Sequence, residues 1–403
     1  MLQIVVNDDE AVDAVPARIK VIGVGGGGTN VVNWMIDCGL QGVEFIAINT
    51  DIQDLTKKSR ATVKLQIGQK LTGGRGAGGV PEKGEKAANE DIEAIREKVK
   101  GADMVFVTAG MGGGTGTGAA PVIAKAAREE GILTIGVVTK PFGFEGTHKM
   151  DVALGGIRKM GEAVDTLITI PNQQLLATAE RKMTILQSLH TADDVLRQAV
   201  QGISDLITQT GFINIDFADV ESTMKNQGEA LMGIGFGSGE NRAAEAAKRA
   251  IDNPLLEETS IEGATKILVN VAGSEELALV ELEEAVNIIR NNADTNVSLI
   301  CGLTLDSELE DKLRVTVVAT GFKAARKSGE EGVNAGEPVK PRETDFIDIN
   351  EWQKIRDHAP KQPEFLSRRG GVFSDEDLDV PTVVRKSAKQ FPLDLTGNTA
   401  EGQ

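Results

Sequence analysis

Met111–Gly112–Gly113–Gly114–Thr115–Gly116–Thr117–Gly118 is the stretch of this sequence that decides the fold. It follows an apolar run, Met104–Thr108, that predicts a buried strand, and it precedes a helical pattern at Pro121–Glu130. Glycines between a strand and a helix let backbone N–H groups approach an anion, and the helix N-terminus favours its negative charge. No Lys-Ser or Lys-Thr follows the glycines, so this is not a Walker A loop, but it predicts phosphate binding.

A second glycine-rich loop, Gly23–Val24–Gly25–Gly26–Gly27–Gly28–Thr29–Asn30, lies earlier in the chain, after the apolar run that starts at Ile19. It contains Gly-x-Gly-x-x-Gly, and Asp51 follows the next expected strand, as in dinucleotide-binding domains. Taken alone, this loop also fits a dinucleotide-dependent oxidoreductase. Two such loops in one α/β domain favour a nucleotide that is held from both sides.

Short Val/Ile-rich runs alternate with helical patterns from Arg18 to Pro171. The runs are apolar without strict alternation, which is typical of a parallel sheet covered by helices on both faces. The sequence therefore predicts an α/β fold with a doubly wound, mostly parallel sheet. The expected strands are Ile19–Val24, Glu44–Asn49, Lys64–Ile67, Met104–Thr108, Leu133–Thr139 and Thr166–Ile170.

A long helical segment, about Asp193–Thr208, separates this domain from a second, smaller α/β domain. After Gly321 the composition changes to Lys, Glu, Arg, Gly and Pro, which predicts a flexible linker. In the second domain we expect strands at Lys266–Val271, Ser298–Gly302 and Leu313–Ala319, and helices at Arg242–Ile251 and Glu276–Asn291. The expected division is a disordered segment 1–17, a nucleotide-binding domain 18–185, a central helix 186–209, a second domain 210–321, a linker 322–374 and a tail 375–403.

The charge of the chain argues against a nucleic-acid partner. Its 43 Lys and Arg against 60 Asp and Glu give a formal net charge of −17, whereas nucleic-acid binding needs a basic surface. Cys38 and Cys301 are the only cysteines, which indicates a reducing compartment. The acidic N-terminus does not have the pattern of a signal peptide, and no apolar stretch is long enough to span a bilayer. We therefore expect a cytoplasmic protein without direct membrane insertion.

The segment Asn214–Ile215–Asp216–Phe217–Ala218–Asp219–Val220 combines two carboxylates with an amide. In one interpretation Asp216 caps the helix that follows. In the other, Asn214, Asp216 and Asp219 orient and polarise a water for attack on a phosphate. Because carboxylates repel a triphosphate, such a group acts best when it reaches the nucleotide from elsewhere.

The glycine loop Gly112–Gly118 and the acidic segment together closely resemble the tubulin/FtsZ family of GTPases, and in particular its bacterial cell-division members. The resemblance extends from about Arg18 to Gly321 and includes Thr139–Phe142, Ile170–Asn172 and Val315–Gly321. It implies a GTP-hydrolysing cytoskeletal protein that polymerises head to tail into protofilaments and forms the division ring at mid-cell. It also implies that GTP or GDP binds together with Mg²⁺.

The resemblance further implies roles for single residues. Asp216 and Asp219, assisted by Asn214, would act on the nucleotide of the next subunit. Glu145 and Lys149, where the family often has Arg, would lie near ribose and phosphate. The residues implied in GTP binding, with Asn172 and Asp193 at guanine, are Gly26, Gly27, Asn30, Asn49, Gly112, Gly113, Gly114, Thr115, Gly116, Thr117, Gly118, Glu145, Lys149, Asn172 and Asp193. No protein ligand for a metal is implied.

The end of the chain resembles the family's C-terminal peptide, which binds membrane-tethering and regulatory division proteins. The implied partner-binding residues are Asp377, Leu378, Asp379, Val380, Pro381, Val383, Val384, Arg385 and Lys386. Pro363–Arg369 is a second candidate for the same role. A third functional class, besides the polymerising GTPase and the oxidoreductase, is a regulatory GTP-binding module that does not polymerise.

Overall fold

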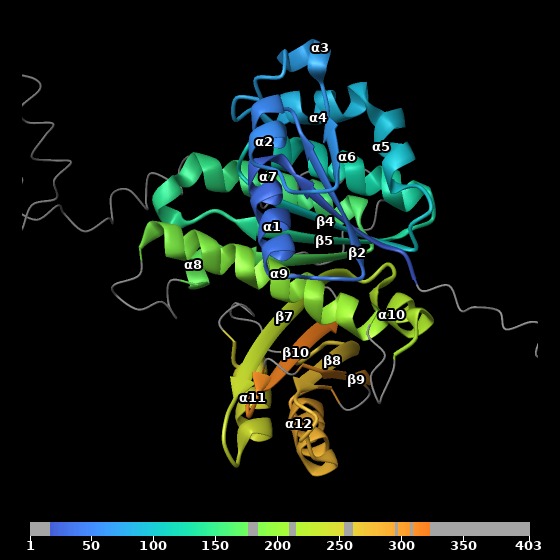
Figure 1. The fold of residues 1–403 in the computed structure, drawn as a ribbon, viewed down its shortest axis with the longest axis vertical. Helices are drawn as coiled ribbons and strands as arrows, with labels where there is room; N and C mark the ends of the chain where they lie inside the picture. The colour runs from blue at the N-terminus through green and yellow to red at the C-terminus, as the bar shows by residue number, and fades with distance from the viewer. Residues whose placement is uncertain are drawn as a thin grey trace, which may run out of the picture. The chain divides into compact units, whose positions relative to one another are not determined.

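The computed structural model describes residues 17–175, 184–208, 215–253, 261–294, 297–306 and 309–322. Asn214, nearly all of the expected N-terminal segment and linker, and the whole tail lie outside these residues. The described strands form one ten-stranded sheet in the order β3-β2-β1-β4-β5-β6-β7-β10-β8-β9 (Figure 1). They are β1 (Ile19–Val24), β2 (Val43–Asn49), β3 (Val63–Gln66), β4 (Met104–Gly110), β5 (Leu133–Lys140), β6 (Thr166–Pro171), β7 (Gly228–Gly237), β8 (Lys266–Gly273), β9 (Ser298–Leu305) and β10 (Leu313–Thr320).

Every neighbouring pair from β3 to β6 is parallel, which confirms the predicted doubly wound sheet. Alternate residues of β1 serve two cores: Val21 packs with α1 and α9, whereas Ile22 and Val24 pack with α4 to α7. The described helices are α1 (Gly25–Asp37), α2 (Ile52–Lys57), α3 (Gln69–Thr72), α4 (Pro81–Glu90), α5 (Ile92–Val99), α6 (Thr115–Glu129), η1 (Gly143–Glu145), α7 (Thr147–Ala163), α8 (Asn172–Leu175), α9 (Ile185–Thr208), α10 (Phe217–Met224), α11 (Arg242–Ile251) and α12 (Leu279–Asn291).

Strand β7 joins the two halves of the sheet and was not predicted from the sequence. Its first residues pair in parallel with β6, and the rest pairs antiparallel with β10. Gly233, Gly235 and Gly237 face α11 so closely that a Cβ on each would stand 1.9, 2.0 and 1.9 Å from a backbone oxygen of that helix. These alternating glycines dilute the apolar pattern of a strand, yet they are what lets α11 pack directly on β7.

Helix α9 crosses the molecule between β1–β6 and β7–β10 (Figure 1). Its buried Leu196, Val200 and Ile203 belong to the same core as Ile168 of β6 and Val318 of β10. A continuous core therefore spans both halves of the sheet. The helix begins at Ile185, next to the start of the expected central helix 186–209 and earlier than the apolar pattern that begins near Asp193. That pattern does not reveal the first turns, because they carry polar residues on an exposed face.

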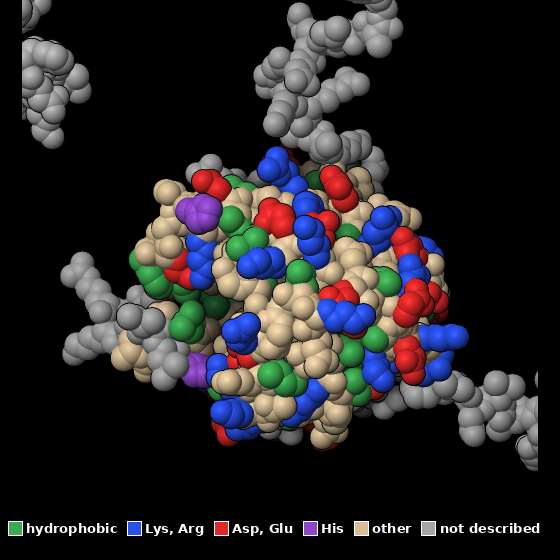
Figure 2. Space-filling model, turned by 90° about the horizontal axis from the view of Figure 1, so that it is seen from above, with side chains coloured by type: hydrophobic (Ala, Val, Ile, Leu, Met, Phe, Trp, Pro, Cys, Tyr) green, Lys and Arg blue, Asp and Glu red, His purple; other side chains and the backbone are tan. Residues whose placement is uncertain are grey.

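The surface seen from above, on the side where α3 and α4 lie, carries basic and acidic side chains interspersed with one another (Figure 2). This face therefore has no single sign of charge. No helix among the described residues combines the length and the apolar character that crossing a bilayer requires.

Candidate functional site

The two glycine loops lie side by side at the carboxyl ends of β1 and β4. These strands are neighbours in register, with Val24 opposite Ala109. A Cβ on Gly25 would stand 2.9 Å from the backbone nitrogen of Gly116, and one on Gly27 would stand 3.2 Å from that of Gly110. Two backbones can approach this closely only where side chains are missing.

Each loop runs directly into the first turn of a helix. Helix α1 begins at Gly25 and α6 at Thr115, so α6 starts six residues before the expected Pro121, within the glycine run itself. Neither helix has a side-chain cap, which leaves first-turn N–H groups available to another acceptor. A Cβ on Gly113 would meet nothing within 4 Å. The arrangement fits an anion bound at two helix N-termini.

A cavity of about 270 Å³ opens beside these loops. It brings together, from both loops, α7, α8 and α9, many residues that the sequence predicts for nucleotide binding. Those that line it are Gly27, Asn30, Gly113, Glu145, Lys149, Asn172 and Asp193. Thr139 and Pro141 at the carboxyl end of β5, and Leu189 and Ala192 of α9, also line it. Two larger hollows lie between α4, α6 and α7, but neither contains Asn172 or Asp193.

Two hydrogen-bond acceptors that line the cavity, on Asn172 and Asp193, have no donor among the described residues. The buried Oδ1 of Asn172 has no hydrogen-bond partner among the described residues. Burial raises the pKa of Asp193 to about 7. Its neighbour Asp194 is half-buried, and hydrogen bonds from Arg197 and Trp34 overcome that partial burial and lower its pKa. Asn172 and Asp193 therefore suit a ligand that brings its own N–H donors.

Glu145 and Lys149 form an ion pair on the cavity wall. Glu145 Oε1 also accepts a hydrogen bond from the backbone nitrogen of Phe142 at 2.9 Å, which fixes the carboxylate at the start of η1. The stem of Lys149 packs against Gly112, whose φ of 103° favours glycine. The ion pair thus holds the Lys149 ammonium group beside the glycine loop that precedes α6.

Other predicted residues shape the loops instead of lining the cavity. Asn49 is buried, and its Nδ2 donates to Asp54 Oδ2 at 2.9 Å. The hydroxyl of Thr115 pairs with that of Thr50 at 2.6 Å. A Cβ on Gly118 would stand 1.9 Å from the carbonyl oxygen of Pro81 at the start of α4, so this glycine serves helix packing. Gly26, Gly112, Gly114 and Gly116 likewise belong to the loops without lining the cavity.

Thr117 holds the loop in shape, since its buried Oγ1 accepts a hydrogen bond from Gly112 N at 2.8 Å. We expect Thr117→Val to leave this buried N–H unpaired and to destabilise the fold by about 1–3 kcal/mol. Thr117→Ser keeps the acceptor and is expected to stay within about 1 kcal/mol of wild type. Urea unfolding of the two variants measures the difference, and equal stabilities would show that the hydrogen bond is not needed.

The acidic segment lies at the other end of α9. Asp216 caps α10 and accepts a hydrogen bond from Asp219 N at 2.7 Å, which confirms the capping interpretation. Both carboxylates are exposed. From Asp193 to Thr208 the helix rises about 22 Å, and α8 and α10 stand at opposite ends of α9 in Figure 1. One chain therefore does not bring Asp216 and Asp219 to its own cavity.

Two family models match the chain. The GTPase domain of the Tubulin/FtsZ family matches residues 18–180, and the C-terminal domain of the FtsZ family matches residues 228–323. The chain is 44% identical to an empty FtsZ dimer of M. jannaschii, covering 77% of this chain and 90% of that one with a TM-score of 0.73. It is 43% identical to a mutant of that FtsZ in which tyrosine replaces a tryptophan, with coverage of 77% and 93% and a TM-score of 0.73. GDP-bound CetZ1 from Haloferax volcanii, at 22% identity, coverage of 77% and 96% and a TM-score of 0.65, shares the fold.

Proposed function

The chain belongs to the tubulin/FtsZ family of cytoskeletal GTPases, and from that premise we propose that it polymerises head to tail into protofilaments and forms the bacterial division ring. Because the chain belongs to a GTPase family, the alternative of a dinucleotide-dependent oxidoreductase, which the loop Gly23–Asn30 alone also fits, is rejected. The observation that carries the proposal is the separation of the cavity from Asp216 and Asp219 along α9. A reaction that needs both requires two subunits.

We propose that GTP lies in the cavity with its phosphates on the two glycine loops. The N–H groups at the starts of α1 and α6 would bind the phosphates, and Lys149 would add a positive charge beside them. Asn172 and Asp193 would accept hydrogen bonds from the guanine edge, because neither acceptor has a donor among the residues that the structure describes. No group of three or more described His, Cys, Asp or Glu side chains could hold a metal. Mg²⁺ would therefore arrive with the phosphates of its nucleotide, which is how this ion is commonly held.

Hydrolysis is proposed to take place between subunits. Asp216 and Asp219, with Asn214, would polarise a water against the γ-phosphate held by the neighbouring chain. Because two different faces of the chain would meet at each contact, the interface is heterologous, and we propose that it does not close on itself and so generates a filament. The similar FtsZ of M. jannaschii is a dimer, which supports self-association of this chain.

Several further parts of the proposal rest on the sequence. We propose a division into a nucleotide-binding domain 18–185, a central helix 186–209 and a second domain 210–321. The buried residues of α9 belong to one core with residues of both domains, as expected for a helix that connects them. The segment Asp377–Lys386 is proposed to bind membrane-tethering and regulatory division proteins, which would place the polymer at mid-cell in the cytoplasm.

The dependence of GTP hydrolysis on protein concentration tests the proposal. We expect activity per molecule and light scattering to rise together above a threshold concentration, because assembly completes the site. A flat activity per molecule, with no rise in scattering, would mean that the monomer contains a complete site. The chain would then be a GTP-binding module that does not polymerise.

A further inference from the structure

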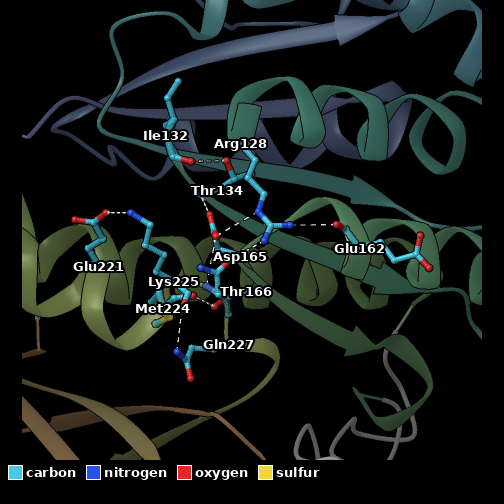
Figure 3. Close-up of polar contacts among 11 residues, drawn as sticks. Arg128, Ile132, Thr134, Glu162, Asp165, Thr166, Glu221, Met224, Lys225 and Gln227 are labelled. Carbon is cyan, nitrogen blue, oxygen red and sulfur yellow. Dashed lines mark hydrogen bonds and ion pairs between the residues drawn. The ribbon is translucent and has the colours of Figure 1, made fainter. Parts of the chain in front are cut away.

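A buried carboxylate, Asp165, joins three parts of the chain just before β6 (Figure 3). It is 4% exposed. Its Oδ2 accepts a hydrogen bond from Thr134 N at 3.0 Å, and its Oδ1 accepts one from Asn226 N at 3.4 Å. Its carbonyl oxygen accepts from the backbone nitrogens of Gln227 and Gly228, both at 2.9 Å. Asp165 therefore fixes the turn between α10 and β7 to the start of the parallel strands β5 and β6.

Arg128, near the end of α6, completes this joint. Its Nε lies 3.5 Å from Asp165 Oδ1, and its Nη2 donates to Asn226 Oδ1 at 2.7 Å. Its Nη1 donates to the carbonyl oxygen of Glu162 at 3.2 Å. Figure 3 shows the guanidinium between Asp165 and the end of α7. A buried carboxylate needs such a charged partner, and Arg128 connects it to the turn after α10.

The C-terminal end of α10 is anchored at each of its last four carbonyl groups, which lack partners inside the helix. The backbone nitrogen of Lys225, the residue after the helix, donates to Glu221 O at 2.8 Å. Side chains from three different strands satisfy the others: Lys266 of β8 donates to Ser222 O, Thr320 of β10 to Thr223 O at 3.1 Å, and Thr166 of β6 to Met224 O. This end of α10 is therefore fixed to the sheet.

The other end of α10 carries Asp216 and Asp219, whose side chains are exposed although Ile215 and Val220 beside them are buried. Eight helical residues rise about 12 Å, so a tilt of about 5° at the anchored end moves the carboxylates by about 1 Å. Displacements of that size in a reacting group can cost about 100-fold in rate. The orientation of α10 thus matters to any chemistry at Asp216.

We propose that Arg128 and Asp165 are positioning residues for GTP hydrolysis, because they hold the turn that directly follows the anchored end of α10 and thereby help to aim Asp216 and Asp219 at the neighbouring subunit's nucleotide. This inference rests on the proposed function, in which those carboxylates act between subunits. Arg128 and Asp165 do not line the nucleotide cavity, so they act on the reaction and not on binding.

The test compares Arg128→Ala and Asn226→Gly with wild type. Asn226 has a φ of 55°, so glycine removes the acceptor of Arg128 without strain, while Asn226→Asp keeps that acceptor. Arg96→Ala is the matched control, because Arg96 pairs with Glu129 and Glu130 at the same end of α6, whereas Arg128 pairs with Asn226 in the turn after α10. The quantities measured are GTP affinity, critical concentration, thermal stability and turnover per polymerised subunit.

We expect turnover per polymerised subunit to fall about 10- to 100-fold in Arg128→Ala and about tenfold in Asn226→Gly. GTP affinity and critical concentration stay unchanged, and Asn226→Asp and Arg96→Ala behave as wild type. Wild-type turnover in both variants would overturn the inference. So would a loss of GTP affinity and thermal stability in proportion to activity, because that is what a purely structural role produces.

Mixed polymers separate this inference from the proposed function. Asp193→Asn subunits keep α10 intact but bind GTP weakly. GTP is therefore supplied at a concentration below the Kd of these subunits, so that their own cavities stay empty. Mixing them with Asp216→Ala subunits restores hydrolysis if the site is shared, and no recovery overturns the proposed function. Mixing them with Arg128→Ala subunits restores it if the defect lies in the subunit that supplies α10. Recovery in the first mixture but not in the second overturns the inference alone.

Discussion

Replacing Asp216 by alanine lowers GTP turnover per polymerised subunit by about 10²- to 10⁴-fold, the usual contribution of a group that activates the attacking water. GTP binding persists, since the cavity lies at the other end of α9. Assembly also persists, because the repulsion between a carboxylate and the neighbouring phosphates is removed. Measuring phosphate release and sedimented polymer in the same sample gives turnover per polymerised subunit.

The structure makes a control essential, because Asp216 is also the cap of α10. Loss of a cap costs about 1 kcal/mol and could itself disturb the helix. Asp216→Ser keeps an oxygen for the N–H of Asp219 but removes the carboxylate. We expect this variant to match wild type in thermal stability and to be as inactive as Asp216→Ala. A serine variant that hydrolyses GTP at the wild-type rate would reduce Asp216 to a helix cap.

Much of the parallel sheet could be predicted from the sequence, because buried parallel strands are continuous apolar runs. β1 occupies the predicted residues, and β4 and β5 extend the predicted runs by one or two residues. The alternating glycines of β7 conceal a strand, because they interrupt its apolar pattern, and their close approach to α11 is a tertiary contact that the sequence does not reveal. The start of α6 was also missed, because glycine disfavours helices locally and the packing of Gly118 against Pro81 decides the outcome.

The sequence predicts which residues gather at the site, but not which of them line the cavity and which serve packing. A glycine run predicts close backbone approach, but it does not tell which glycine faces a cavity, as Gly113 does, and which faces a helix, as Gly118 does. Asp193 and Asp194 are adjacent acids, and only their orientation separates the one on the cavity from the one bound by Arg197. The contacts of Asp165 with Arg128, Thr134 and Asn226 could not be predicted from the sequence, because these partners come from distant parts of the chain.

Asp193→Asn is expected to weaken GTP binding about 100- to 1000-fold at pH 8, and to reduce the preference for GTP over ATP by a similar factor. The carboxylate can accept the two neighbouring N–H donors of guanine, and hydrogen bonds to a charged group contribute about 1.5–3 kcal/mol each. An asparagine amide retains one acceptor and turns a donor toward the other N–H group. Equilibrium titration with the two nucleotides measures both effects, and unchanged selectivity would remove Asp193 from the guanine site.

The pH dependence of binding distinguishes a carboxylate that recognises guanine from one that is merely nearby. Burial raises the pKa of Asp193 to about 7 in the free protein, and donors from guanine favour the ionised form and so lower it in the complex. Affinity is therefore full above pH 7 and falls about tenfold per unit below it, until the pH reaches the lower pKa of the complex. Asp193→Asn abolishes this slope. Asp194→Asn keeps one acceptor oxygen but loses the negative charge that pairs with Arg197 and the second oxygen that accepts from Gln198, so it is expected to lower thermal stability while the slope remains. A slope that survives in Asp193→Asn would assign the titration to another group.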